Sequence, residues 1–371
     1  MKSRLSIAVL ALALLAVPTA LAGEYSDTMT FDSDSLIVRN LIGEVDVKPG
    51  GSQFEVTVHV RGADADRDAI EFDQDGDELR LVFPDAKKFV YPKLGNGKMN
   101  FSMGDGEGSL LGALFGRGRR IQVSGRGSGL ELWADVEIKV PDGAELKVYH
   151  GAGDVSADGV EGTLTLDTHS GEVNANKIYG DLLIDTGSGA VTVSSVRGEL
   201  FVDTGSGRVD AADIDGPEIS IDTGSGSVSL TRAIVTGDVT VDTGSGRVML
   251  DDVEGEEFTV DTGSGSVTAR AVRAEAMTVD TGSGSVELEL SAMGSGDFDV
   301  DTGSGGIVLA LPTNASATVY AESNSGVALE LDDVRKLRKD DDEMSFVVGG
   351  GDARVNLEAG SGRVRIVPLG S

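Results

Sequence analysis

Apolar and polar residues alternate in short runs through the second half of the chain. Val239 and Val241 alternate with the polar Thr240 and Asp242, and apolar residues at every second position resume with Val248 and Leu250. Alternation with a period of two, rich in β-branched residues, predicts half-buried β-strands. Between these two runs lies the phrase Asp242-Thr-Gly-Ser-Gly, whose glycines reach backbone angles that other residues adopt only at a cost. The phrase is therefore predicted to be a corner between two strands.

This corner recurs at a nearly fixed interval. Literal copies of the phrase begin at Asp185, Asp203, Asp222, Asp242, Asp261, Asp280 and Asp301, and a near copy containing His169 begins at Asp167. The successive intervals are 18, 18, 19, 20, 19, 19 and 21 residues. A single pair of short strands cannot bury its apolar face, but pairs stacked at ~4.8 Å per layer can. The period therefore predicts an all-β fold, a right-handed single-stranded parallel β-helix (β-solenoid) with inserted loops; the right hand follows from the usual sense of parallel crossovers.

The same alternation predicts which side chains face the inside of the coil. They are Leu182 and Ile184, Leu200 and Val202, Ile219 and Ile221, Val239 and Val241, Phe258 and Val260, Met277 and Val279, and Phe298 and Val300. Because their neighbours in the strand point the other way, the aspartate of each phrase is expected to face outward and the threonine inward.

One solenoid domain is predicted over residues 23–371, with regular coils at 163–330. Two stretches depart from the repeat. Residues 85–128 are basic and rich in glycine, and they are predicted to be an inserted surface loop, mostly mobile. A loop that docks a partner, or that folds along the acidic wall of the solenoid, is the alternative. Residues 332–343 are predicted to be a charged insertion. The last coil is expected to be closed by residues 346–348 and 364–367.

The beginning of the chain has the pattern of a secretory signal peptide at residues 1–22. Lys2 and Arg4 precede an apolar run, and Ala20-Leu-Ala22 fits a cleavage site. The mature chain is thus expected to be exported, to the periplasm or the cell surface, without a transmembrane segment. The sequence contains no cysteine, which excludes disulfides and a lipoprotein anchor.

The strongly acidic composition bears on the partner. The formal net charge of −31 excludes non-specific nucleic-acid binding as a main activity and favours cations or cationic surfaces. Stacked carboxylates repel one another, so a weak, superficial Ca²⁺ contact along the corner aspartates is a second interpretation of their role. No other cofactor is predicted.

Asp-Thr-Gly-Ser is also the active-site phrase of pepsin-like aspartic proteases. Those enzymes need two facing carboxylates that share a proton, whereas repetition at one period places the carboxylates in a column on one wall. A structural corner is preferred, in which each aspartate accepts N–H groups in an Asx-type turn and the threonines form an inward ladder. The predicted column, with no catalytic residue and no metal site, contains Asp167, Asp185, Asp203, Asp222, Asp242, Asp261, Asp280 and Asp301.

Histidines offer few alternatives for catalysis, since the chain contains only His59, His150 and His169. His150 and His169 lie about one coil apart, and a surface stack is preferred to a weak metal pair. A polysaccharide-active enzyme with its site under residues 85–128 stays open as an alternative function.

The repeated Gly-x-Val/Leu-x-Val/Ile-Asp-Thr-Gly-Ser-Gly-x-Val period, the lead-in Val136-Glu-Ile-Lys-Val140-Pro-Asp-Gly and the signal peptide together resemble the bacterial putative-adhesin family. The resemblance implies a secreted or cell-envelope β-strand-repeat domain of unknown function, and it brings no catalytic residues. We expect a non-enzymatic, exported, adhesin-like binding module that presents one long wall to a surface ligand such as a glycan or an envelope polymer. A structural envelope component that self-associates is the third alternative.

Overall fold

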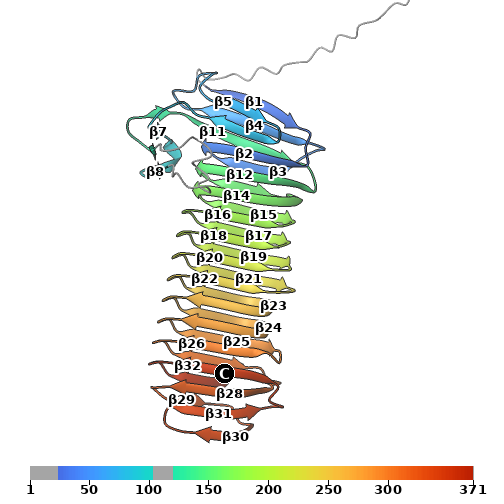
Figure 1. Ribbon diagram of the computed structural model, residues 1–371, viewed down its shortest axis with the longest axis vertical. Coiled ribbons are helices and arrows are strands. Elements are labelled where there is room, and N and C mark those ends of the chain that lie inside the picture. Colours follow the sequence, from blue (N-terminus) through green and yellow to red (C-terminus); the bar gives the residue numbers. More distant parts are fainter. Residues whose placement is uncertain (1–23, 103–119, 371) are drawn as a thin grey trace, which may run out of the picture.

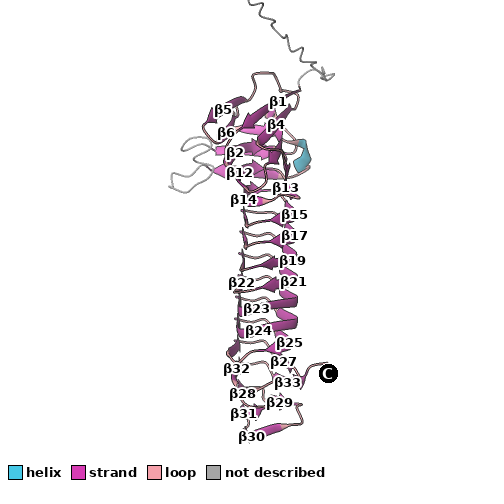
Figure 2. Ribbon diagram, turned by 90° about the vertical axis from the view of Figure 1, so that its right-hand side faces the viewer, coloured by secondary structure: helices cyan, strands magenta, loops and turns pink. Residues whose placement is uncertain are grey.

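The chain forms a long rod built from one stack of β-strands (Figures 1 and 2). The structure is a computed structural model, and it describes residues 24–102 and 120–370. The stack is a 29-stranded sheet, and a separate four-stranded sheet lies beside it. In the described ranges the only helical element is one 3-10 turn. The all-β, parallel solenoid expected from the repeat is therefore confirmed, while the predicted signal peptide lies outside the described residues.

Each regular coil contributes strands to two parallel walls. The first, here called the Asp wall, contains β14 (Gly162–Ser170), β16 (Leu182–Thr186), β18 (Leu200–Thr204), β20 (Ile219–Thr223), β22 (Val239–Thr243), the second halves of β23 (Val248–Thr262) and β24 (Val267–Thr281), and β26 (Asp297–Thr302). The second wall contains β15 (Val173–Tyr179), β17 (Val191–Arg197), β19 (Val209–Gly216), β21 (Val228–Val235), the first halves of β23 and β24, β25 (Val286–Met293) and β27 (Ile307–Leu311). Register partners lie one coil apart, as Leu182 and Leu200 do.

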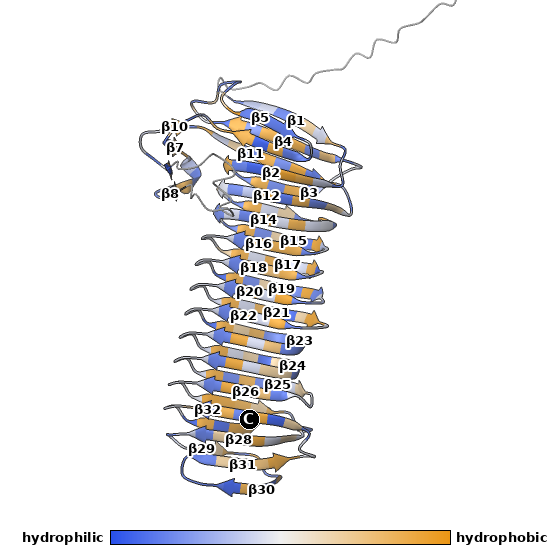
Figure 3. Ribbon diagram, viewed as in Figure 1, coloured by the Kyte–Doolittle hydropathy of each residue, from blue (hydrophilic) through white to orange (hydrophobic). Residues whose placement is uncertain are grey.

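The core of the rod is the narrow space between these walls. Every inward residue predicted from the alternation is at most 4% exposed. Figure 3 shows the corresponding alternation of apolar and polar positions along the strands. Because apolar area removed from water is the main source of stability, the stacked Val, Ile and Leu side chains hold the coils together.

A second corner follows four residues after the start of each second-wall strand from β15 to β24. Its residues adopt a left-handed backbone with φ between 51° and 59°, and they are Lys177, Ser195, Asp213, Arg232, Asp252 and Ala271. The variation in coil length comes after this corner: Leu200 follows Ser195 by five residues, and Val239 follows Arg232 by seven. Up to β24, both walls therefore keep their register although the coils differ in length; the pairing of β24 with β25 contains a register shift.

The N-terminal end is closed by antiparallel strands. They are β1 (Tyr25–Phe31), β4 (Phe54–Arg61), β5 (Glu71–Asp75), β6 (Glu78–Val82) and β11 (Trp133–Val140). Beneath them, β2 (Ser35–Ile42) and β3 (Val45–Pro49) form a coil on which β12 (Ala144–Ala152) and β13 (Val155–Asp158) stack in parallel. Antiparallel pairing at this end covers the parallel edge that would otherwise stay open to other strands.

The described part of residues 85–128 is ordered into strands, which corrects the prediction of a surface loop. It contains β7 (Lys88–Val90), the 3-10 turn η1 (Pro92–Leu94), β8 (Lys98–Ser102) and β9 (Arg120–Ser124), and with β10 (Leu130–Glu131) these form the four-stranded sheet. Phe89, Tyr91 and Val123 are buried, and the Tyr91 ring lies 5.7 Å from that of Trp133. An apolar face against the cap therefore holds this sheet in place. Residues 103–119 lie outside the described part.

The C-terminal end is built out of sequence order (Figures 1 and 2). It contains β28 (Ala317–Ser323), β29 (Val327–Leu329), β30 (Val334–Lys339), β31 (Glu343–Val348), β32 (Ala353–Ala359) and β33 (Val364–Pro368). Strand β32 lies between β26 and β28, and β33 lies between β27 and β29. The predicted closing coil is thus wrong in part: β31 pairs antiparallel with β28 and with β30, which occupies much of the predicted charged insertion.

Candidate functional site

The Asp-Thr-Gly-Ser-Gly corner is held by its threonine. Thr223 is fully buried; its Oγ1 accepts the N–H of Gly226 at 3.0 Å and donates to the carbonyl of Gly207, one layer away, at 3.1 Å. The same pair of bonds recurs at Thr243, Thr262, Thr281 and Thr302. The described aspartates make no such side-chain bond, so the predicted Asx turn is wrong and the inward threonine supplies the turn instead. The inward ladder links threonine to glycine backbone rather than threonine to threonine.

The last glycine of the corner leaves no room for a side chain. A Cβ on Gly226 would overlap the carbonyl oxygen of Gly207 in the layer before, and the same overlap recurs at Gly246 and Gly265. Close approach of successive backbones therefore requires glycine here. This close stacking of the glycines fixes the distance between the aspartates of successive layers.

The aspartates form an outward row with one carboxylate per layer, here called the Asp row. Asp185 pairs in register with Asp203, and the register continues layer by layer to Asp301. Beyond Asp301 the row continues as Glu358, Glu322 and Glu343. From Asp203 to Asp301 every aspartate of the row is exposed. Within the described ranges, none of the row's side chains forms an ion pair or a hydrogen bond.

Burial, and then the crowding of the carboxylates, raises the pKa of several members of the Asp row. Partial burial first, and a neighbouring aspartate second, raise the pKa of Asp185, Asp222, Asp261 and Asp301. The effect is largest at Asp167, where burial and then the charge of Asp185 raise the pKa to about 7. The row thus carries unneutralised negative charge that a cationic group would stabilise.

The N-terminal end of the row is different in kind. Asp167 is only 9% exposed, and its register partner on the far side is Tyr149. The guanidinium of Arg39 lies 4.4 Å from the centre of the Tyr149 ring and pairs with Glu78 at 2.8 Å. The row therefore ends here against an aromatic ring backed by a cation.

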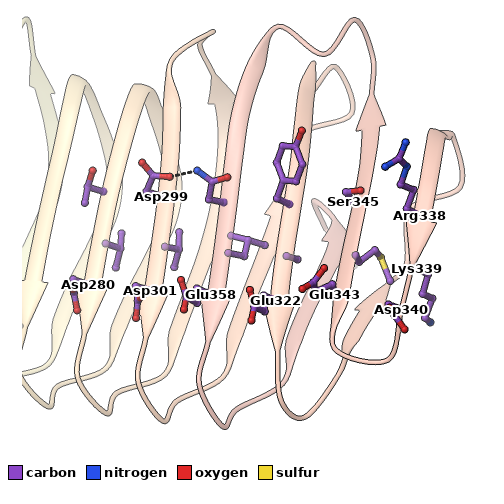
Figure 4. Close-up of a pocket in the computed structure, with 18 residues that line it drawn as sticks. Asp280, Asp299, Asp301, Glu322, Arg338, Lys339, Asp340, Glu343, Ser345 and Glu358 are labelled. Carbon is purple, nitrogen blue, oxygen red and sulfur yellow. Dashed lines mark hydrogen bonds between the residues drawn. The ribbon is translucent and has the colours of Figure 1, made fainter.

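At the other end the wall is hollowed into a groove of about 840 Å³ beside the C-terminal strands (Figure 4). Asp280, Asp301, Glu358, Glu322 and Glu343 line one side in a single row. The parallel row beside them contains Asp299, whose Oδ1 accepts from Asn356 at 2.5 Å, and Tyr320, which is 51% exposed. Arg338 and Lys339 of β30 stand at the far end. The groove offers carboxylates and one aromatic face.

His150 and His59 lie apart from this wall surface, whereas His169 is exposed in the corner that follows Asp167 on β14. His150 is 2% exposed and occupies the inward column, in register with Asn40 and Thr168; the predicted surface stack with His169 is therefore wrong. Its Nε2 lies 3.0 Å from the Gly43 carbonyl, and burial lowers its pKa to about 4. His59 contacts Ser26 at the N-terminal cap. In the described residues, no three His, Cys, Asp or Glu side chains are grouped to hold a metal ion.

Fold and site together define a parallel β-solenoid that presents one acidic wall. Residues 196–366 match the family described as Toastrack DUF4097, a family of unknown function. The matched residues include most of the regular coils and the C-terminal end. The resemblance predicted from the repeat is confirmed for them.

Two further comparisons add little. A crystal structure of a putative cell adhesion protein from Clostridium sporogenes is similar over 93% of this chain and 99% of its own, at 11% identity and a TM-score of 0.16. A TM-score this low carries no argument about fold or function. No curated protein matches the chain. In the described part of the chain, no helix is both long and apolar enough to cross a membrane.

Proposed function

We propose that this protein is an exported, non-enzymatic, adhesin-like binding module whose Asp wall holds a ligand bearing positive charges. The observation that carries the proposal is the Asp row: carboxylates stacked in register from Asp185 to Asp301, continued by three glutamates, with no cationic partner among the described side chains. A ligand with repeated cationic groups relieves the mutual repulsion of the row.

The wall suits an extended polymer better than a small molecule. Its carboxylates repeat at ~4.8 Å along the rod, so many weak contacts are made at once and add up. An amine-bearing glycan or envelope polymer has the matching chemistry. The groove at the C-terminal end, with Tyr320 exposed beside the row, is where such a polymer would find an additional ring contact.

A binding assay on the whole mature chain tests this function. We expect saturable binding to an amine-bearing polysaccharide such as a glucosamine polymer, weakened by salt, and none to its fully N-acetylated form. Asn at Asp222, Asp242 and Asp261 should weaken binding at least tenfold. The matched control places Asn at Asp210, Asp215 and Asp251 of the second wall, which changes the net charge equally. An equal loss of affinity in both triple variants would show that net charge alone attracts the polysaccharide, and it would contradict the proposal.

Export is the second part of the proposal, supported by the signal-peptide pattern at residues 1–22. Protease treatment of intact cells, before and after the outer membrane is permeabilised, tests it. Digestion of intact cells fits a surface ligand, whereas protection until permeabilisation fits an envelope polymer in the periplasm. Recovery in the cytoplasm would contradict export. The right-handed sense of the coil also stays a prediction from the crossover rule.

The alternative of a polysaccharide-active enzyme places its site under residues 85–128. The groove described above lies at the opposite end of the rod, between β24 and β30. Release of products from acidic glycans, lost when residues 103–119 are deleted, would revive that alternative.

A further inference from the structure

The last coil of the rod is filled by a segment that arrives out of order. Strands β32 and β33 (residues 353–368), here called the C-terminal insert, lie between two coils that precede them in the chain. Each insert strand pairs on both sides: Val355 with Phe298 and Val319, and Ile366 with Leu309 and Leu329. Without the insert, β26 and β27 would face β28 and β29 across an empty layer. The rest of the chain therefore forms a slot that the insert completes.

A glycine-rich turn joins the insert to the rest of the cap. Gly349, Gly350 and Gly351 precede β32, and two of them have left-handed backbones, with φ of 57° and 85°. The turn is held by Ser316, whose Oγ accepts the N–H of Gly350 at 2.8 Å and donates to Asp352 at 2.6 Å. Four residues, 349–352, extend to about 13 Å, which is more than two layers. The turn is thus rich in glycine, which makes its backbone flexible, and only a few polar contacts hold it in this conformation.

The contacts inside the slot do not depend on which chain supplies the insert. Val355, Leu357, Val364 and Ile366 are at most 2% exposed and repeat the apolar pattern of every other coil. Gly360 and Gly362 stack on Gly303 and Gly305 as the corner glycines do elsewhere. A second copy of residues 353–368 would make the same ladder bonds and bury the same side chains. Only the turn at 349–352 distinguishes the chain's own insert from another's.

We propose that the slot is a strand-exchange site, in which the C-terminal insert of one copy completes the last coil of a second copy. Reciprocal exchange leaves every slot filled, so the dimer loses no ladder contact and costs only the association entropy and a rearranged turn. The two rods would then meet at their C-terminal ends. There, β30 carries Arg335, Lys336, Arg338 and Lys339, which offset the acidity of the walls. The exchange is independent of the proposed ligand.

Cysteine pairs test the exchange in the whole mature chain, which has no cysteine of its own. Asp299 of β26 and Asn356 of the insert are register partners on the outer face. Chains carrying Asp299→Cys and chains carrying Asn356→Cys are mixed, refolded together at low and high concentration, and oxidised with oxidised glutathione. We expect a disulfide-linked heterodimer whose yield rises with concentration. The matched control mixes Thr240→Cys with Thr259→Cys, register partners in consecutive coils.

A heterodimer yield no higher than that of the control pair, at every concentration, would overturn the proposal. A second variant separates exchange from association through the walls. When Asp299→Cys and Asn356→Cys are combined in one chain and oxidised at low concentration, the insert is locked in its own slot. We expect this variant to stay monomeric where the reduced chain dimerises. Equal dimerisation of the locked and reduced chains would also contradict exchange, since it would place the contact elsewhere.

Discussion

Two corners with the same five residues differ in the hydrogen bonds that hold them. At Asp203–Gly207 the glycine N–H turns inward to Thr204 at 3.0 Å, whereas the Oγ1 of Thr186, in the identical phrase at Asp185–Gly189, has no partner. One layer earlier, the N–H of Gly171 donates to the carbonyl of Ser188 in the next layer along the rod. Because the five residues are identical, the stacked neighbours must set the corner. The early layers stack on His150 and on the cap, and the later ones stack on each other.

The largest loss of stability is expected when the last glycine of a later corner is replaced. Gly226→Ala places a Cβ onto the carbonyl of Gly207, and backbone cannot move away within a stack. We expect a loss of about 4 kcal/mol or more, or failure to fold. Denaturant unfolding measures it, with Gly51→Ala, which meets no atom, as the control. Equal midpoints for the two variants would show that the stack can open at a corner.

The threonines give the sharpest test of the two corner types. Thr243→Val removes two hydrogen bonds and leaves the Gly246 N–H and the Gly226 carbonyl unpaired, so we expect a loss of about 2–4 kcal/mol. Thr186→Val removes a hydroxyl that bonds to nothing and should leave stability unchanged or raised by up to ~1 kcal/mol. Denaturant midpoints of the two variants decide it. Equal losses would mean that both corners bond alike.

The buried end of the Asp row should respond to pH. The pKa of Asp167 is raised to about 7, so its stabilising protonated state is present at low pH and is lost as the pH rises through 7. Asp167→Asn should therefore stabilise the protein at pH 8, by about 1–3 kcal/mol, and the difference should shrink toward pH 4. Thermal unfolding from pH 4 to 8 measures it. Asp242→Asn, at an exposed position of the row, is the control and should show a smaller change.

His150 should give the opposite pH dependence. Burial lowers its pKa to about 4, so the stability of its neutral form is present above pH ~6.5 and is lost as the pH falls toward 4. His150→Thr, which installs the residue found in the next layer at Thr168, should flatten the unfolding profile between those two values. An unchanged slope in this window would show that the imidazole stays reachable by water.

The smallest effect is expected at the second corner. Ala271 has φ 51°, a conformation that costs residues with a Cβ about 1 kcal/mol. Ala271→Gly should therefore raise stability by up to ~1 kcal/mol. Ala276→Gly, at a partly exposed strand position of the same β24, should lower it by a similar amount, because glycine loses more entropy on folding. If the denaturant midpoints of both variants shifted in the same direction, the strain assigned to the left-handed backbone of Ala271 would be contradicted.

The repeat alone predicted most of the middle of the rod. Alternation at positions such as Val239 and Val241 predicts strands and a core, and an invariant phrase predicts a corner, because stacking repeats the same local problem. The sequence does not say which partner satisfies the corner: aspartate and threonine can both accept an N–H, and the choice of Thr223 over Asp222 depends on the Gly207 carbonyl one layer away.

The ends could not be predicted in the same way. Every coil presents the same apolar alternation, so nothing in residues 353–368 indicates that they fit between two earlier coils rather than after the last one. His150 was misplaced because its alternation matches an inward threonine, while its residue type suggested a surface. The continuation of the Asp row by Glu358, Glu322 and Glu343 was missed because those glutamates follow the spatial order of the strands and not their sequence order.

The coils differ in their number of residues, and this bears on what determines the length of the rod. Because the additional residues fall after the left-handed corner, coils of 18 and of 20 residues each add the same step of ~4.8 Å along the axis. The distance between the two closed ends is thus counted in coils and not in residues. We therefore expect that inserting or deleting one whole coil would leave both ends unchanged. The length of the rod, and with it the number of ligand contacts along the wall, therefore changes by an equal step with each coil.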